Sequence, residues 1–334
     1  MIRLPEPCGP LSEGVVRALR ARPDGPHAVA EPRAMGDVEY PLTDRDFQLA
    51  LWMLYELHYG GFEEVPPEVE WDPLLIVSRA ALERTFEHAV RRLVGPVSVP
   101  DGDITRALVK LTTASGPSEV ARFLHRRATR AEFCSYLRER AVYHLRESDP
   151  QSFVLPRISG AAKTALAELQ NDEYGAGEPT RQHQLLFAQA LTSLGMTTDL
   201  TSYVEEAEGA TLASVNVMSL FALNRRLRGA AMGHLAAFEA TSSLPCDRIL
   251  RGARRLRLPE EVAAYYDEHV EADAIHEQLA IRGICARLAE DEPGLTDDIM
   301  LGALACLAVD GLAGDVLLQG WQADRAARTS REAG

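Results

Sequence analysis

Two histidines and an aspartate lie on one stripe of a predicted helix near the C-terminus. In AAYYDEHVEADAIHEQLA, the residues His269, Asp273 and His276 stand at positions i, i+4 and i+7, which places their side chains on one helix face. Two imidazoles and a carboxylate that face the same way are usual ligands of first-row transition metals, and open positions on such a site suit iron that binds oxygen. The alternative is a solvated polar face, but the stripe flanks apolar Val270 and Ala274. The spacing therefore favours a metal site.

A single helix of this kind cannot hold two metal ions, and further acids occur upstream. In LAELQNDEYGAGEPTRQHQLLF, Glu173 ends one predicted helix and His183 lies inside the next. The glycines and the proline between them let the chain kink, so that both side chains can face one point. Taken alone, Glu173 is more typical of a solvated helix end. Glu147, in YHLRESDPQSF, precedes a Ser-Asp-Pro stop and is ambiguous alone.

Glu239 differs from these two acids because its surroundings, GHLAAFEATSS, are apolar. An unpaired buried carboxylate is costly, so a cation or a metal ion is expected beside it. Helical bundles with di-iron sites use this inventory, with carboxylates and histidines projected inward from several facing helices.

Helices must position these residues, because helix signals dominate the chain. Aromatic residues make up only 6% of the sequence, and no stretch shows sustained period-two alternation, which argues against a sheet-based core. Residues 1–45 are predicted to form an irregular arm with one short helix near 11–21, and Asp44 is predicted to cap a helix over 45–60. Further helices are predicted near 73–93, 103–113, 117–127, 129–147, 158–173, 179–194, 199–207, 210–241, 246–253, 259–290, 295–309 and 312–330.

Composition and charge exclude several classes of protein. The 334 residues are 46% apolar and 25% charged, and 35 basic against 49 acidic residues give a net charge of −14. That charge argues against binding to nucleic acid or to an anionic membrane. No apolar run approaches the roughly 18 residues of a membrane span, and the N-terminus lacks the apolar core of a signal peptide, so we expect a cytoplasmic protein. Five scattered cysteines without a CxxC pair argue against a zinc knuckle or a disulfide framework.

Taken as a set, the acids and histidines resemble the ligands of the haem-oxygenase-like di-iron oxidases and oxygenases, the iron-containing redox enzyme family. The segments LPRISGAAKTALAELQNDEYGAGEPTRQHQLLF, FALNRRLRGAAMGHLAAFEATSS and YYDEHVEADAIHEQ are similar to one bacterial branch of it. The likeness spans nearly the whole chain, including LALWMLYELHYGGF. The resemblance implies an all-α, haem-oxygenase-like helical bundle with a core of seven helices and no haem.

The resemblance also implies roles for single residues and a division of the chain. The implied metal ligands are Glu147, Glu173, His183, Glu239, His269, Asp273 and His276. Because the counterpart of Glu239 in the family can move onto the metal as oxygen binds, Glu239 is the expected catalytic residue. Glu139 lies eight residues before Glu147 on roughly the same face and stays an alternative to it. Residues 1–95 are expected to be an N-terminal extension that packs on a di-iron domain over 96–330, within one structural unit.

The implied function is that of a non-haem di-iron oxidoreductase of secondary metabolism, with two Fe(2+) ions per chain and O2 as co-substrate. A small organic molecule is the expected partner, with no nucleic acid and no membrane; a homodimer and an external electron donor stay open. Two outcomes are close: N-oxygenation of an amine or guanidine, and oxidative C–C cleavage or desaturation of an amino or fatty acid. One alternative is a thiaminase-like hydrolase on the same fold, which needs a cysteine nucleophile in the pocket, although no cysteine is expected beside the acids and histidines. The other is a metal-binding protein without catalysis.

Other polar residues carry weaker signals. His234 is expected to be a core histidine, and His144 carries no signal. The arginines near 225–228 and 251–257 are expected to be solvated or paired with acids, although they can bind a substrate carboxylate. Core packing is expected for the tyrosines that neighbour the implied ligands, namely Tyr143, Tyr174, Tyr265 and Tyr266.

Overall fold

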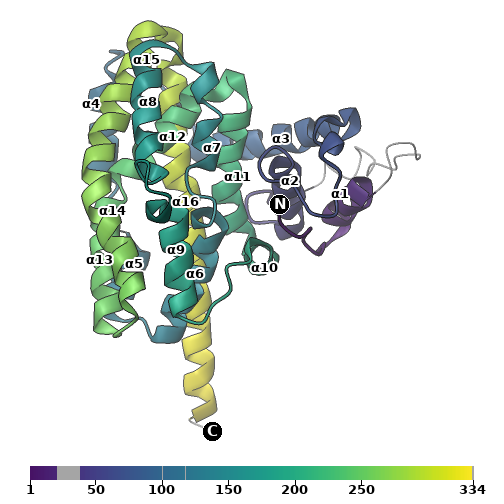
Figure 1. Cartoon of the computed structure of the whole chain (residues 1–334), viewed down its shortest axis with the longest axis vertical. Helices are drawn as coiled ribbons and strands as arrows, with labels where there is room; N and C mark the ends of the chain where they lie inside the picture. The colour runs from purple at the N-terminus through teal and green to yellow at the C-terminus, as the bar shows by residue number, and fades with distance from the viewer. Residues whose placement is uncertain (21–37, 100, 117, 333–334) are drawn as a thin grey trace.

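The predicted all-α class is confirmed. The computed structural model of the chain describes residues 1–20, 38–99, 101–116 and 118–332, apart from the side chains of 271–274 and 331–332. Within these residues the only β-type contact is an isolated bridge between Ile2 and Phe62. Figure 1 shows an elongated helical bundle with the N-terminal helices attached to one side and the C-terminal end projecting beyond it.

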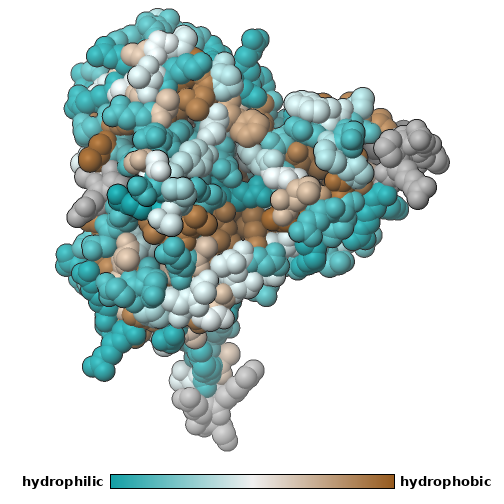
Figure 2. All heavy atoms as spheres, viewed as in Figure 1, coloured by the Kyte–Doolittle hydropathy of each residue, from teal (hydrophilic) through white to brown (hydrophobic). Residues whose placement is uncertain are grey.

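The N-terminal part contributes α1 (Pro10–Arg20), α2 (Arg45–Glu56) and α3 (Pro73–Val94). The α2 helix is buried along nearly its whole length, because it packs against α1, α3 and the bundle helix α11 (Gly209–Leu223). The predicted cap is confirmed, since the Asp44 carboxylate accepts a hydrogen bond from the Phe47 N–H at 2.8 Å. Figure 2 shows hydrophobic residues gathered where the N-terminal helices meet the bundle, on a face that is otherwise mostly hydrophilic.

The bundle is built around two buried helices, α11 and α12 (Arg228–Ala240), which pack against the long C-terminal helix α16 (Thr296–Glu332). Glycines allow α12 to approach that helix closely, because an added Cβ at Gly233 would overlap the carbonyl oxygen of Ile299. The remaining helices are α4 (Ile104–Ala114), α5 (Glu119–Arg126), α6 (Arg130–His144), α7 (Asp149–Ser152), α8 (Gly160–Glu173), α9 (His183–Ser193), α10 (Leu200–Glu206), α13 (Ser243–Arg255), α14 (Glu260–Gln278) and α15 (Arg287–Asp291).

The predicted helix over 210–241 is wrong, because the chain breaks at Asn224. The backbone there is extended, with φ −104° and ψ 106°. The Asn224 amide donates to the Leu220 carbonyl at 3.0 Å and to the Glu83 carboxylate at 2.9 Å. An asparagine side chain that bonds the backbone in this way competes with helix propagation.

The predicted break near 310 is also wrong, since 295–309 and 312–330 belong to the single helix α16. A glycine inside a helix lowers its stability by about 1 kcal/mol relative to alanine but does not end it. A Cβ added at Gly314 would lie only 3.1 Å from Cγ2 of Val120, so the helix packs closely there. The predicted helix over 259–290 is interrupted by a π-helical segment over Leu279–Ala286, which apolar periodicity does not reveal.

One stretch of the described chain, Pro293–Ser330, is long and apolar enough to cross a membrane, contrary to the expectation that no run approaches that length. Its side chains Ile299, Ala303 and Cys306 are at most 2% exposed inside the bundle. A core helix meets the same criteria of length and composition, so this stretch alone is weak evidence for a membrane segment.

Candidate metal centre

Six of the seven implied ligands gather inside the bundle in two groups. The first group consists of Glu147, His183 and His269, and the second of Glu173, Glu239 and His276. Within each group one ligand atom from every residue lies within 4.8 Å of the others, and all six side chains are buried. We call them the first and the second triad.

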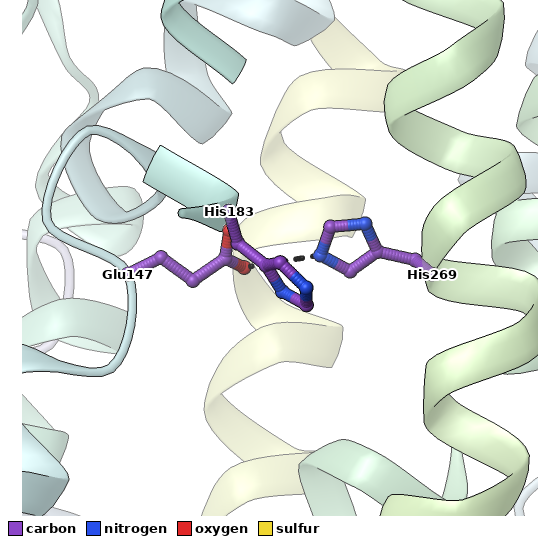
Figure 3. Close-up of side chains that lie close together, drawn as sticks. All are labelled: Glu147, His183 and His269. Carbon is purple, nitrogen blue, oxygen red and sulfur yellow. Dashed lines mark ion pairs between the residues drawn. The ribbon is translucent and has the colours of Figure 1, made fainter. Parts of the chain in front are cut away.

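The first triad is assembled from three elements. Glu147 lies in a turn after α6, His183 at the start of α9 and His269 in the middle of α14. Figure 3 shows Glu147, His183 and His269 pointing at one another from these separate elements. Glu147 lies beyond the end of α6, so the predicted helix over 129–147 is three residues too long. Ser148 reverses the chain with φ 70°, and its hydroxyl donates to Gln170 of α8 at 2.8 Å. This bond fixes the turn that carries Glu147.

The kink that the sequence indicates places one residue of each triad, Glu173 of the second and His183 of the first. Glu173 is the last residue of α8 and His183 the first of α9. The chain between them turns at Gly175, where φ is 86° and a Cβ would collide with the Glu178 carbonyl oxygen. Only glycine fits this position, and the turn brings the end of one helix beside the start of the next.

The imidazole of His269 is oriented by its own helix. Its Nδ1–H donates to the Tyr265 carbonyl at 2.7 Å, which leaves Nε2 facing Glu147 Oε1 at 3.7 Å. The same device appears at many metal sites, where the second ring nitrogen is held by a backbone carbonyl or a carboxylate.

His276 is oriented by an acid that the sequence did not single out. Its Nε2 lies 2.7 Å from Asp172 Oδ2, while Nδ1 faces Glu173 at 3.2 Å and Glu239 at 3.4 Å. Asp172 directly precedes Glu173, and this adjacency is the one signal that could have indicated it. The carboxylate–imidazole pair fixes the ring with Nδ1 directed at the second triad.

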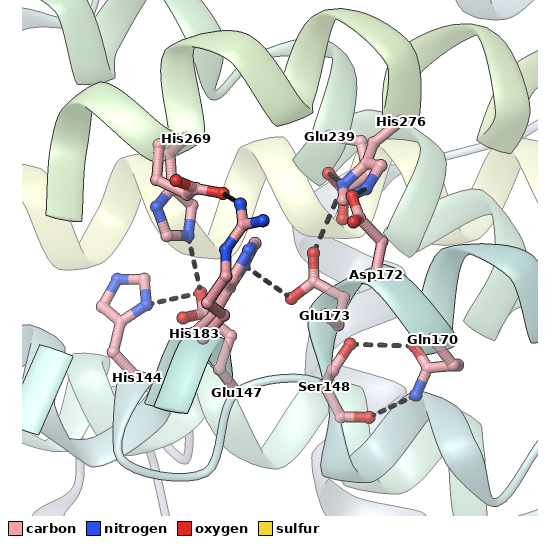
Figure 4. A network of polar contacts seen from close by, with 12 residues as sticks. His144, Glu147, Ser148, Gln170, Asp172, Glu173, His183, Glu239, His269 and His276 are labelled. Carbon is pink, nitrogen blue, oxygen red and sulfur yellow. Dashed lines mark hydrogen bonds and ion pairs between the residues drawn. The ribbon is translucent and has the colours of Figure 1, made fainter. Parts of the chain in front are cut away.

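Glu173 connects the two triads. Its Oε1 lies 3.2 Å from His276 Nδ1 and its Oε2 lies 3.2 Å from His183 Nδ1. Figure 4 shows this carboxylate between the two groups, with one oxygen turned to each. Glu173 therefore faces a histidine of each triad, with one oxygen turned to each.

The charges of the second triad depend on one another. Burial raises the pKa of the Glu173 carboxyl, but the imidazoles of His183 and His276 outweigh it and hold that pKa at about 2. Burial lowers the pKa of His276, yet the two glutamates raise it to about 11. Burial and the charge of Glu173 raise the pKa of Glu239. Without metal, the group therefore keeps protons that a divalent cation can replace.

The donor set fits iron. Two buried nitrogens, His183 Nδ1 and His276 Nδ1, have no hydrogen bond of acceptable geometry among the described residues, although carboxylate oxygens lie 3.2 Å away. Neither nitrogen forms a hydrogen bond of good geometry with the nearby oxygen, as expected where a nitrogen and an oxygen share a metal ion rather than a proton. Imidazole and carboxylate donors without a thiolate suit iron or manganese.

Several other predicted residues can now be placed. Glu139 belongs to neither triad, because its carboxylate accepts hydrogen bonds from the Thr211 hydroxyl and from the Glu208 N–H at 3.3 Å. Its position therefore favours Glu147 as the candidate ligand. Asp273 lies in α14 between the two ligand histidines, but its side chain is outside the described residues. His234 is buried against Phe238, and burial lowers its pKa to about 4, as expected for a core histidine.

Three residues around Glu147 were missed or given another role. His144 Nδ1 lies 2.7 Å from Glu147 Oε1, and the Tyr265 hydroxyl donates to Glu147 Oε2 at 3.0 Å. Arg140 Nε donates to His144 Nε2 at 3.2 Å, so the proton of the neutral imidazole is on Nδ1 and points at the carboxylate. The spacing i, i+3 of His144 and Glu147 was the available signal.

A cavity of about 470 Å³ lies beside the triads, and its walls include Glu147, Glu173, Glu239 and His269. This volume is typical of sites for small organic molecules. Cys246 also lines the cavity, a placement that the sequence did not indicate.

The fold and the site define a class: a helical bundle that buries two carboxylate–histidine groups of the kind that bind transition metals. The sequence model of the iron-containing redox enzyme family matches residues 134–311, which is more than half of the chain and includes all seven implied ligands. The chain belongs to this family, and the resemblance to it is confirmed over these residues, whereas the likeness expected before residue 134, including LALWMLYELHYGGF, stays a prediction. No curated protein matches the sequence.

Proposed function

We propose that the protein is a non-haem di-iron enzyme that uses O2 to oxidise a small organic substrate. Membership in the iron-containing redox enzyme family supports iron and redox chemistry. The observation that carries the di-iron proposal is Glu173, whose two oxygens each lie 3.2 Å from a histidine of a different triad. A single-ion site has no use for a carboxylate shared in this way.

The first triad would hold one ferrous ion and the second triad the other, with Glu173 shared and Asp273 as a further ligand on the strength of its spacing. When bound, the iron pair supplies the electrons and the open coordination positions for O2 activation. The protein contributes the orientation of the ligands: Asp172 fixes the ring of His276, and the Tyr265 carbonyl fixes that of His269.

Glu239 is proposed as the conditional ligand. Burial and the charge of Glu173 raise the pKa of its carboxyl, which favours the protonated form when no metal is bound. Positive charge added beside it favours the ionised form, and the carboxylate can then bind. The cavity next to Glu239 distinguishes this proposal from metal storage, because a storage site needs no room for an organic molecule.

Anaerobic titration with ferrous iron tests the proposal. The wild-type chain should take up two ions, and His276→Ala should lose at least one of them while its helical circular dichroism is unchanged, since the apolar core does not depend on metal. His88→Ala is the matched control, because His88 is exposed and belongs to neither triad. Uptake of one ion or none by the wild-type protein would refute the di-iron assignment.

A further inference from the structure

One basic side chain lines the cavity beside the triads. Among the described residues of its wall, Arg140 is the only lysine or arginine. It lies on α6, one helical turn before His144, and the exposed part of its side chain faces the cavity. The hydrogen bond from Nε to His144 Nε2, at 3.2 Å, is the one found for its guanidinium among the described residues. The remaining N–H groups are therefore left to be satisfied by what enters the cavity.

The guanidinium stays charged inside the protein. Burial lowers the pKa of Arg140, but Tyr136 and Asp310 raise it above its ordinary value. No ion pair joins Arg140 to an acid among the described residues. Glu139, the neighbouring residue on α6, is engaged with Thr211 instead. A buried charge without a direct counter-ion is unfavourable, and a carboxylate bonded to the remaining N–H groups would supply one.

We propose that Arg140 binds the carboxylate of the substrate and that the cavity selects small monocarboxylic acids. This inference rests on the proposed function, because it takes the cavity to be the substrate pocket. A guanidinium binds a carboxylate through two parallel hydrogen bonds. The hydrocarbon part of the acid then lies against apolar walls such as Phe238 and Val215.

The acidic residues in the rest of the cavity wall explain why the substrate is expected to carry one carboxylate and not two. Glu139 and Asp310 line the same cavity as the acids of the triads. A second carboxylate on the substrate would lie near these acids without a cation of its own and would be repelled. The contact from Arg140 through His144 to Glu147 also ties the anion site to the first triad, so a bound acid is held at a fixed place relative to the proposed metal ligands.

Calorimetric titration of the metal-free full-length chain tests this, because a carboxylate cannot then bind to iron. The probes are 3-phenylpropionate, 3-phenylpropanol and 3-phenylpropylamine, which differ only in their end group, together with phenylsuccinate as a dicarboxylate. The acid should bind at least tenfold more tightly than the other three. Arg140→Gln should abolish this preference and Arg140→Lys should retain part of it. Arg138→Gln, which removes an exposed arginine from the same helix, should leave it unchanged.

The inference would be overturned if the acid and the alcohol bind equally, if the amine binds more tightly or if the acid does not bind. It would also be overturned if Arg140→Gln keeps the full preference for the acid. If Arg140→Gln does not fold, Asp310→Asn provides the second variant: removing an acid whose charge acts on Arg140 should tighten binding of 3-phenylpropionate, and unchanged or weaker binding would contradict the inference. Uptake of two ferrous ions without any preference for the acid would leave the proposed function intact and refute only the role of Arg140. Selective binding of the acid without iron uptake would refute the proposed function and leave the role of Arg140 intact.

Discussion

Asp172→Asn is predicted to weaken metal binding at the second triad, although it replaces none of the proposed metal ligands. The Asp172 carboxylate lies 2.7 Å from His276 Nε2, on the side of the ring opposite to the second triad. Asparagine keeps the shape of the side chain and offers a neutral carbonyl oxygen as acceptor. The substitution therefore removes the negative charge that orients the imidazole of His276 and that makes Nδ1 a stronger metal ligand. The imidazole itself is retained.

The size of the effect follows from the contact and its exposure. Loss of a group that holds a ligand histidine weakens metal binding by about 10- to 100-fold, or roughly 1.4 to 2.7 kcal/mol. The Asp172 side chain is 52% exposed, and solvent screens its charge. We therefore expect about a tenfold loss for Asp172→Asn and a larger loss for Asp172→Ala, which removes the acceptor as well.

Competition with a chelator of known affinity, under anaerobic conditions, resolves the two ferrous binding steps. Only the step assigned to the second triad should weaken, because His269 in the first triad is oriented by the Tyr265 carbonyl instead. Glu168→Gln is the control, since it removes an exposed acid one turn earlier on α8. An equal loss in the control would show that the net charge of α8 matters and not the bond to His276. Unchanged affinity in Asp172→Asn would refute the assigned role.

Three further predictions concern other parts of the molecule. Glu239→Ala should slow O2 consumption far more than it weakens ferrous binding, because its raised pKa makes Glu239 a conditional ligand; equal losses would make it a permanent one. Cys246→Ser should leave ferrous uptake and O2 consumption unchanged, whereas a thiaminase-like hydrolase that uses this cavity cysteine would lose its activity. Glu132→Gln should lower the free energy of unfolding at pH 7 by about 1 to 2 kcal/mol. Because hydrogen bonds from Arg325 hold the pKa of Glu132 at about 2, the stabilisation is complete above the ordinary pKa of 4.5 and lost as the pH falls towards 2. Urea unfolding between pH 7 and pH 3 should therefore show a flatter pH dependence in the variant.

The helices could be predicted wherever local chemistry marks their ends. Asp44 caps α2 through a hydrogen bond to a residue three positions away, and the chain turns at Gly175 with a positive φ. The sequence indicates both, because an aspartate before a helix is typical of a cap and the glycines are typical of a turn. The break at Asn224 was missed, because part of its reason is Glu83, which lies 141 residues away. The continuity of α16 through Gly311 and Gly314 is likewise decided by packing, since isolated glycines do not reveal whether a helix has neighbours that support it.

The ligand residues were easier to predict than the residues that orient them. His269 and His276 share a helix face, so their spacing alone directs both to one side of α14, although the structure places them in different triads. The bond between Asp172 and His276 spans 104 positions, and Tyr265 reaches His144 across 121. Such pairs depend on how α8, α6 and α14 pack, and a single sequence does not contain that information.

The two triads differ in how their carboxylates are held, and this difference bears on their roles. Glu147 accepts hydrogen bonds from His144 and Tyr265, and burial is outweighed by the His144 interaction, so its pKa stays well below the ordinary value. It is ionised and fixed in place with or without metal. Glu239 has His276 as its neighbour at 3.4 Å and a raised pKa, so its charge depends on what else occupies the second triad. A fixed anion on one side and a conditional anion on the other give the pair of proposed ions unequal surroundings, and the cavity contacts both Glu147 and Glu239. Under the proposed function, Glu239 would therefore be the carboxylate that can change its ligation, while Glu147 would keep its place.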